Sequence, residues 1–360
     1  MGKRPVLPAK SYPPILKDPL SPRSESDNGE RQTSVREGQA SAYRLYSRFL
    51  SPADAVVVSY VGLIGVLVVI FSFRISYWRE LLGVHVLAIF LIVLLLRRPG
   101  VAFSPKGDEV ISTNGGDASG LLWGRHLSFV VLRFWYLLLV IPFTYKELEY
   151  LIPRIHPRDY DHQLAALDYR VFGVNPVVWL GNITTPPLTL ALQLSYLTYY
   201  IFPIALAIVL WSRKEFDRFH FLLFIVALGF YVSYIGYIAV PAIGPRFFLD
   251  GQVMPFRGGA VAFIRGVLNR AEGITRDCFP SGHTELTLLV LYCAYRFHRR
   301  TFWIMLAPGL ALIFSTVYLR YHYAVDVVAG AIVALVIALT ADSVYAALGG
   351  TGKLRSDSGS

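Results

Sequence analysis

Two histidines and one aspartate stand where they could carry out chemistry on a phosphate. His283 follows Pro280-Ser281-Gly282 at the start of an apolar run, and His322 lies four residues before Asp326 at the start of another. Histidine exchanges protons near neutral pH, and an imidazole steadied by a carboxylate can act as a nucleophile. On a helix, the spacing of His322 and Asp326 would put them on one face. The pattern favours phosphoryl transfer, with His322 as nucleophile and His283 as the acid that protonates the leaving oxygen.

The segment before His283 is suited to hold an anion. Ser281 can cap a helix, which leaves backbone N–H groups and the positive end of the helix dipole facing outward. Gly282 lets the backbone approach a bound group closely. These segments contain no acidic cluster for magnesium, so arginine must supply the positive charge, and Arg246 is the first candidate. We therefore expect a site with no metal and no cofactor.

The composition places this chemistry in a membrane. Hydrophobic residues make up 54% of the chain and charged residues 16%, whereas about a quarter of a soluble domain is charged. The mean hydropathy is +0.49. The net charge of +10 does not indicate nucleic-acid binding, because basic residues cluster at the ends of apolar segments, as in Arg97-Arg98, Arg213-Lys214 and Arg299-Arg300. The lipid bilayer is the expected partner.

Eight apolar runs are candidate membrane spans, since about 20 helical residues cross a bilayer core. They predict an all-α, polytopic transmembrane helical bundle, and they are Ala55–Phe73, Leu81–Leu96, Leu127–Phe143, Leu188–Trp211, Phe219–Val240, Ser281–Phe297, Phe302–Leu319 and Tyr323–Leu348. We expect the Glu285 side chain to remain hydrated near the membrane–water interface. We divide the chain into a disordered cytoplasmic tail (1–50), accessory transmembrane helices (51–145), a catalytic membrane domain (146–348) and a disordered C-terminal tail (349–360).

Short basic connectors indicate the orientation, because such loops stay on the cytoplasmic side. Arg97–Gly100, Ser212–Arg218 and Arg296–Arg300 fall on one side if both termini are cytoplasmic. The candidate site then lies on the non-cytoplasmic face, and we expect the plasma membrane as its location. The loops on that face also contain arginines, which suggests a local role for positive charge.

The motifs resemble the type 2 phosphatidic acid phosphatase superfamily, whose pattern is K-x6-R-P, then P-S-G-H, then S-R-x5-H-x3-D. Pro280–His283 matches the second element, and His322 with Asp326 matches the end of the third. The resemblance implies a membrane-helical core of that superfamily. It also implies His322 as nucleophile, His283 as acid and Asp326 as the supporting carboxylate.

Two positions depart from that pattern. Ala239 stands where the first-motif lysine is expected and Thr316 where the third-motif arginine is expected. Similar losses occur in the branch that looks like inositol phosphorylceramide synthase, to which Tyr318–Asp326 and Asp168–Gly173 are also similar. Arg320 or Arg276 could replace the lost charges.

The motifs leave the outcome of the reaction open. Both a lipid phosphatase and a head-group phosphotransferase would form a phosphohistidine from a lipid phosphate or phosphodiester. Water would then resolve it in the first case and a lipid hydroxyl in the second. The alternative is a catalytically retired scaffold that acts as a lipid transporter or scramblase, which the lost cations motivate. The sequence does not choose an oligomeric state.

Overall fold

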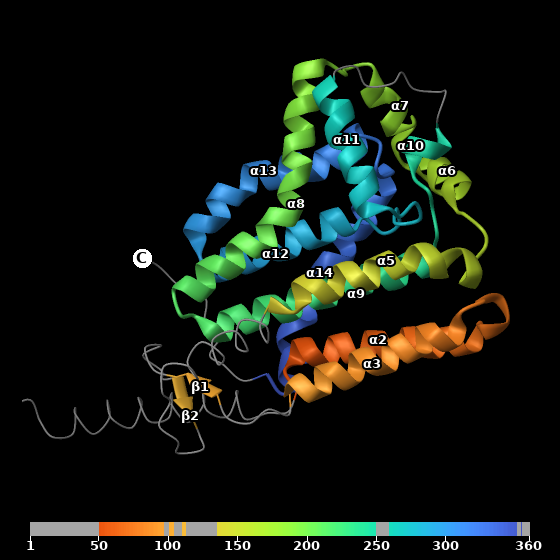
Figure 1. The fold of residues 1–360 in the computed structure, drawn as a ribbon. Coiled ribbons are helices and arrows are strands. Elements are labelled where there is room, and N and C mark those ends of the chain that lie inside the picture. The colour runs from red at the N-terminus through yellow and green to blue at the C-terminus, as the bar shows by residue number, and fades with distance from the viewer. Residues whose placement is uncertain are drawn as a thin grey trace, which may run out of the picture.

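Eight long helices run back and forth in the described part of the chain, and α12 lies among them (Figure 1). The computed structural model describes residues 50–96, 101–103, 110–112, 135–249, 259–350 and 354. The long helices are α2 (Pro52–Ile70), α3 (Trp78–Leu96), α5 (Leu137–Ile155), α8 (Pro186–Ser212), α9 (Phe216–Ala239), α12 (Gly282–Phe297), α13 (Arg299–Tyr318) and α14 (Ala324–Ala347).

Shorter elements connect the long helices. They are η1 (Ser72–Arg74), α6 (Asp161–Phe172), α7 (Pro176–Gly181), α10 (Pro245–Phe248), α11 (Gly259–Glu272) and the strands β1 (Val101–Phe103) and β2 (Val110–Ser112). The two strands form one antiparallel pair, with Ala102 opposite Ile111. Apart from this pair, the described elements are helical, as the sequence predicts.

Helix α12 packs against α8, α9, α13 and α14, and most of its side chains are buried. Its surroundings overturn the expectation for Glu285. That side chain is fully buried, and its Oε2 accepts a hydrogen bond from the hydroxyl of Ser233 on α9. The sequence pattern missed this because the partner comes from another helix.

Five described helices are long and apolar enough to cross a membrane: α2, α8, α9, α13 and α14. Large apolar side chains on the outside of the bundle are mostly uncovered by the described residues; Trp303 is 65% exposed, Ile304 67% and Leu339 75%. Such surface is suited to lipid rather than water. The described residues are thus those of an integral membrane protein, while the number of eight spans stays a prediction.

The third predicted span differs from the helix found there. Residues 127–134 of that span lie outside the described residues, and α5 runs on from Leu137 to Ile155. Its second half carries Lys146, Glu147 and Glu149. Nearly all of the predicted N-terminal tail, and most of the C-terminal one, also lies outside the described residues.

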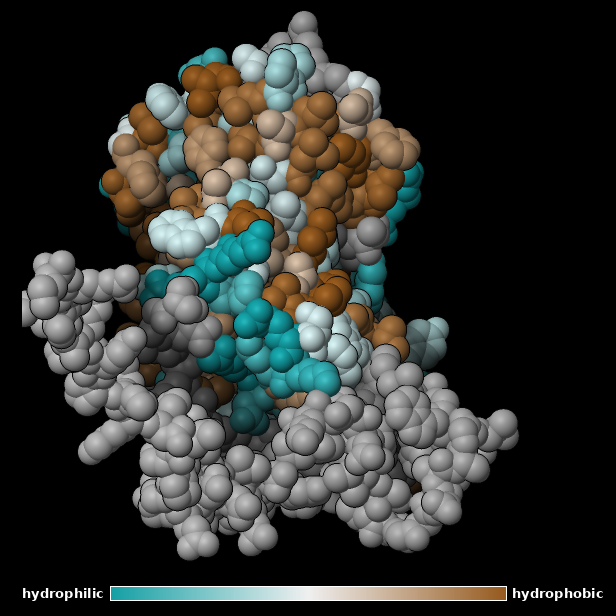
Figure 2. All heavy atoms as spheres, turned by 90° about the vertical axis from the view of Figure 1, so that its left-hand side faces the viewer, coloured by the Kyte–Doolittle hydropathy of each residue, from teal (hydrophilic) through white to brown (hydrophobic). Residues whose placement is uncertain are grey.

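The two ends of the bundle differ in polarity. The connectors 213–215 and 298 join α8 to α9 and α12 to α13 at one end, while α12 and α14 begin at the other. Figure 2 looks toward the end with the connectors and shows hydrophilic side chains gathered below a largely apolar surface. The helices therefore bring the start of α12 and the start of α14 together, away from the basic connectors.

Candidate active site

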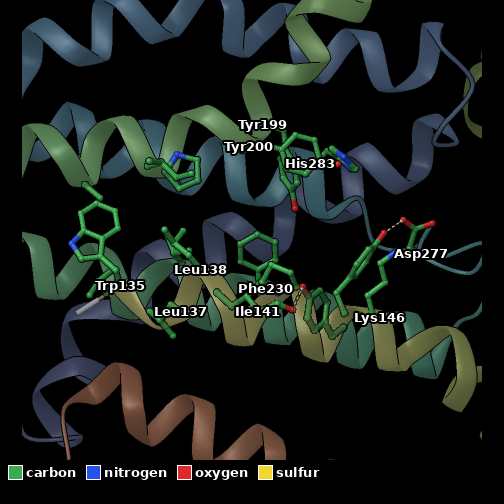
Figure 3. Close-up of a pocket in the computed structure, with 18 of the residues that line it drawn as sticks. Trp135, Leu137, Leu138, Ile141, Lys146, Tyr199, Tyr200, Phe230, Asp277 and His283 are labelled. Carbon is green, nitrogen blue, oxygen red and sulfur yellow. Dashed lines mark hydrogen bonds between the residues drawn. The ribbon is translucent and has the colours of Figure 1, made fainter. Parts of the chain in front are cut away.

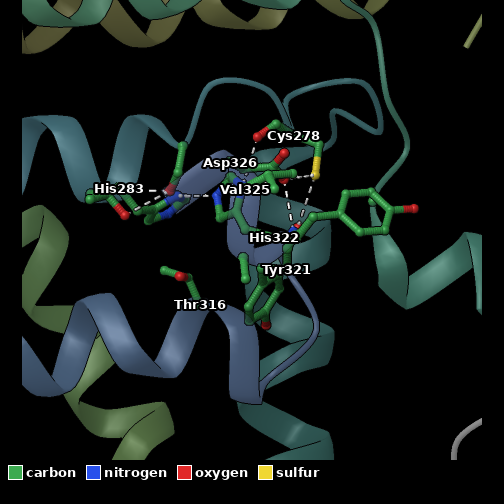
Figure 4. A network of polar contacts seen from close by, with 12 residues as sticks. Cys278, His283, Thr316, Tyr321, His322, Val325 and Asp326 are labelled. Atoms are coloured by element: carbon green, nitrogen blue, oxygen red, sulfur yellow. Dashed lines mark hydrogen bonds and ion pairs between the residues drawn. The ribbon is translucent and has the colours of Figure 1, made fainter. Parts of the chain in front are cut away.

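The two predicted catalytic histidines contact each other directly. The Nδ1 atom of His283 lies 3.2 Å from Nε2 of His322, and the ring centroids are 5.4 Å apart. Both side chains are buried, with 8% and 2% of their surface exposed. Both rings belong to one network of polar contacts with Cys278 and Asp326 (Figure 4). A phosphorus atom could approach His322 Nε2 only after this contact opens.

The backbone carbonyl of Cys278 is the nearest acceptor for the other nitrogen of His322. His322 Nδ1 lies 2.7 Å from that oxygen and 3.6 Å from Oδ2 of Asp326. A proton on Nδ1 donates to the carbonyl, so Nε2 keeps its lone pair and accepts from His283. The carbonyl therefore fixes the tautomer, and Asp326 supplies negative charge close to the ring.

Cys278 is part of the site, although neither its type nor its spacing predicts such a role. Its thiol donates to Oδ2 of Asp326 at 2.9 Å, and the same oxygen accepts from the backbone N–H of Tyr323 at 2.8 Å. Burial raises the pKa of the Cys278 thiol, and the charge of Asp326 adds to this effect. The thiol accordingly stays protonated and acts as a donor.

His322 lies in a turn and not on the helix that the spacing suggested. Helix α13 ends at Tyr318 and α14 begins at Ala324. The carbonyl of Thr316 accepts from the N–H groups of Tyr321 at 2.8 Å and His322 at 3.1 Å, which closes the turn. The Thr316 hydroxyl donates within its own helix, to Ile313 at 2.7 Å. Thr316 thus shapes the turn but brings no charge to it.

Ser281 caps α12 as predicted from its type. Its Oγ accepts from the N–H of Thr284 at 3.3 Å, and its own N–H donates to the carbonyl of Asp326 at 3.0 Å. A Cβ on Gly282 would collide with the hydroxyl of Tyr237 and approach Ser233. Close packing against α9 is thus a sufficient reason for glycine at this position, whether or not a phosphate binds there.

Two aspartates of α6 hold the loops of the site in place. Asp161 accepts from the N–H groups of Ile243 at 2.9 Å and Gly244 at 2.8 Å, and from the hydroxyl of Tyr323 at 2.9 Å. Asp161 therefore joins the loop before Arg246 to the turn after His322. A buried carboxylate of this kind gave no recognisable signal in the sequence.

Asp168 ties α6 to the start of α14. Its carboxylate accepts from the N–H of Ala324 at 3.1 Å and of Val325 at 2.8 Å. These N–H groups belong to the first turn of α14 and have no acceptor within the helix, and a negative charge is favoured at that position. Asp168 opens the Asp168–Gly173 segment that the resemblance singled out.

Arg246 and Arg265 lie close to the ring of Tyr321, the residue before His322. Each guanidinium carbon is 5.1 Å from the ring centroid. Arg265, on α11, also donates to the carbonyl of Leu319 at 3.0 Å. Arg265 could not be assigned to the site from its spacing, because its position depends on how α11 folds back over the site. The surplus of arginines in this loop region was the available signal.

The other two predicted cations differ in position. Arg320 is buried in the turn, with 7% of its surface exposed. Burial lowers its pKa, and the nearby charge of Arg265 lowers it further. Arg276 is engaged elsewhere, since its guanidinium donates to both carboxylate oxygens of Asp159, at 2.6 and 3.0 Å. Arg320 thus lies near Arg265, whereas Arg276 is neutralised by Asp159.

Aromatic rings connect these arginines to His283. The ring of Tyr196 stacks on Tyr321 with centroids 4.4 Å apart and on His283 at 4.6 Å. Tyr199 packs against His283 at 4.2 Å. Both tyrosines lie on α8, and their packing restrains the imidazole ring.

Cys278, His322 and Asp326 are close enough together to be considered as metal ligands, with donor atoms within 4.8 Å of one another. Their hydrogen bonds compete with that use, because the Cys278 thiol is a protonated donor to Asp326 and His322 Nδ1 faces a carbonyl. A metal ligand must present a thiolate and a free imidazole lone pair. The expectation of no metal stays a prediction, tested below with a chelator.

Comparisons with known proteins point to one superfamily. The PAP2 superfamily model matches residues 162–340, which contain His283, His322 and Asp326. A PA-phosphatase related-family protein of Dictyostelium discoideum is 24% identical over 188 residues, covering 43% of this chain and 32% of the relative. A bacitracin transport permease protein of Bacillus licheniformis is 36% identical over 63 residues, covering 18% and 31%. No solved structure matches the chain.

The fold and these matches define a class: an all-helical integral membrane protein whose site lies in a segment similar to the PAP2 superfamily. The comparisons support that superfamily, and a membrane protein of this kind fits a lipid phosphatase. The chain spans about a third of the length of the two curated relatives it matches.

Proposed function

We propose that the protein transfers the phosphoryl or head-group phosphate of a lipid through a phosphohistidine on His322. The observation that carries the proposal is the buried contact of 3.2 Å between His283 Nδ1 and His322 Nε2. It joins a nitrogen with a free lone pair to a proton donor, which are the two groups that substitution at phosphorus requires.

The reaction runs in two steps. The Nε2 lone pair of His322 attacks phosphorus while the bond from phosphorus to the leaving oxygen breaks. His283, protonated on both ring nitrogens when the anionic phosphate is bound and released from its contact with His322, gives its Nδ1 proton to that oxygen and becomes neutral. Water or a lipid hydroxyl then attacks the phosphohistidine and returns a proton to His283. Asp326 stabilises the positive charge that develops on His322 during the attack.

The arginines around Tyr321 supply the charge that the phosphate needs. Arg246 follows the loop that Asp161 holds, Arg265 lies on α11, and Arg320 lies in the turn after α13. Phosphoryl transfer depends largely on positioning and on neutralising the phosphate oxygens. These three cations replace the lysine and arginine that are absent at Ala239 and Thr316.

We expect the purified protein to turn over a lipid phosphate. Offered phosphatidic acid, a polyprenyl diphosphate, or phosphatidylinositol with ceramide, the protein should release phosphate or make a new sphingolipid. His322→Ala and His283→Ala should lower turnover by about 10³-fold or more, since each removes a reacting group. His162→Ala, an exposed histidine on α6, is the control and should retain full activity.

Further outcomes decide against the proposal. Turnover should persist in EDTA and stop with vanadate. Inactivity toward every lipid phosphate, together with insensitivity to vanadate, would refute the proposal that the protein is an enzyme. Phosphate release without a sphingolipid product would identify a phosphatase and would argue against the inositol phosphorylceramide synthase-like branch.

The second candidate function is lipid translocation on a retired scaffold, which the neutral side chains of Ala239 and Thr316 favour. In that case His322→Ala protein in vesicles would move a labelled lipid between leaflets as fast as the unmodified protein. An enzyme would instead lose turnover in the same variant.

A further inference from the structure

An apolar cavity of about 560 Å³ leads along the bundle to His283 (Figure 3). It lies between α5, α8 and α9, and its walls are almost entirely apolar side chains, such as Ile141, Ile204 and Val226. Both α5 and α8 pack against α9. The cavity therefore runs over α9, with the other two helices as its sides.

One end of the cavity is polar and reactive. His283 lines it there, and Nε2 of this buried ring has no hydrogen-bond partner among the described residues. Asp277 and Lys146 lie toward the same end, whereas Trp135 lies at the opposite end (Figure 3). A ligand in this cavity would thus present one polar end to the site and the rest of its length to apolar walls.

The cavity also has side chains at the surface of the bundle. Leu138 on α5 is 47% exposed and Tyr200 on α8 is 41% exposed, and both line the cavity. Helix α8 is long and apolar enough to cross a membrane, and the first turns of α5 are apolar. A hydrocarbon chain could therefore enter between α5 and α8 without crossing water.

We propose that this cavity binds one hydrocarbon chain of the lipid whose phosphate reacts at His322, an inference that rests on the proposed function. A water molecule, similar in size to a methylene group, takes about 30 Å³ of the liquid, so the cavity holds on the order of 20 chain carbons. That is enough for one chain. A second chain, if the lipid has one, stays in the bilayer.

Helix α5 lines the cavity although it lies outside the segment that matches the superfamily. It precedes the matched segment 162–340, yet Leu138, Ile141 and Tyr145 form one side of the cavity. The matched segment thus contains the reacting residues, while α5, which lies outside that segment, completes the wall of the cavity.

The test separates chain binding from chemistry. Ile204→Trp fills the cavity from α8, and Ile208→Trp puts the same side chain one turn further on, where Ile208 is 53% exposed and does not line the cavity. Two single-chain lipid phosphates with the same head group are compared, one with about 16 chain carbons and one with about 6, since only the longer fills the cavity.

We expect Ile204→Trp to lower kcat/KM for the long chain by about tenfold and to leave the short chain within about twofold, because only the long chain needs the blocked space. Ile208→Trp should leave both unchanged. Equal losses for both chains, or no loss for either, would overturn the inference while the unmodified enzyme still shows the proposed function.

A binding measurement covers the case in which no substrate turns over. The long-chain lipid phosphate, carrying a photoreactive group at its chain end, is crosslinked to His322→Ala protein in nanodiscs. Labels should fall on α5, α8 or α9 within the cavity and should decrease in the double variant with Ile204→Trp. Labelling spread over outward-facing residues such as Trp303 and Leu339 would refute chain binding even if the enzyme proposal itself has failed.

Discussion

At the scale of single residues, His322 takes its orientation from two unequal partners. The Cys278 carbonyl is 2.7 Å from Nδ1 and the carboxylate of Asp326 is 3.6 Å away. In a serine-protease triad the aspartate performs both tasks, fixing the tautomer and stabilising the charged ring. Here the backbone performs the first, which leaves Asp326 the second.

Asp326→Asn should therefore reduce kcat by about 10²- to 10³-fold, less than the loss of about 10⁴-fold seen when a triad aspartate also sets the tautomer. Cys278→Ala keeps the carbonyl and removes only the thiol, so kcat should fall by less than about fivefold. Steady-state kinetics on any substrate found above measures both. A larger loss in Cys278→Ala than in Asp326→Asn would contradict this division of roles.

At the scale of elements, the contact between α12 and α14 aligns the two histidines. A Cβ added at Gly330 of α14 would collide with the carbonyl of Ser281 at the start of α12. Ser281 in turn donates to the carbonyl of Asp326. The two helices can hold these positions only because glycine lets their backbones meet.

Gly330→Ala should destabilise the protein by about 1–3 kcal/mol through overpacking and should lower activity by shifting His283. Gly62→Ala on α2 is the matched control, since nothing lies within 4 Å of its added Cβ. Thermal unfolding in detergent compares the two variants. Equal melting temperatures would show that α12 and α14 can separate at little cost.

Asp168 gives α6 and α14 a pH-dependent link. Burial raises the pKa of Asp168 from 3.8 to about 6. The folded state thus binds this proton more tightly than the unfolded state does, so the contribution to stability is complete below about pH 4 and is lost as pH rises through about 6. Asp168→Asn should remove this part of the decline between pH 4 and 6. Thermal unfolding curves that run parallel for both proteins across that range would refute it.

Site residues that belong to a short sequence motif could be predicted, whereas those that depend on contacts between distant segments could not. Pro280–His283 and the spacing of His322 to Asp326 identified residues that the fold brings together, because each set stands at the start of an apolar helix. The orientation of the His322 ring and the burial of Glu285 could not be predicted, since they depend on the carbonyl of Cys278, which lies before α12, and on Ser233 of α9. The role of Arg265 likewise required the position of α11.

At the scale of the whole molecule, the predicted orientation can be tested directly. Both native cysteines, Cys278 and Cys293, are buried, so single cysteines can be added without removing them. His162→Cys on the site side should react with an impermeant maleimide in intact cells, and Arg300→Cys only after permeabilisation. The reverse result would place the site on the cytoplasmic face and would reject the rule applied to the basic connectors.

The short length of α12 affects which head groups can react. With 16 residues, α12 is about 24 Å long, about 6 Å less than a bilayer's hydrocarbon core. If the polar connector at its far end lies at the level of the lipid head groups, we expect His283 to lie below the opposite head-group plane. A lipid would then have to lower its phosphate below those of its neighbours to react, and we expect narrow head groups to react faster than broad ones.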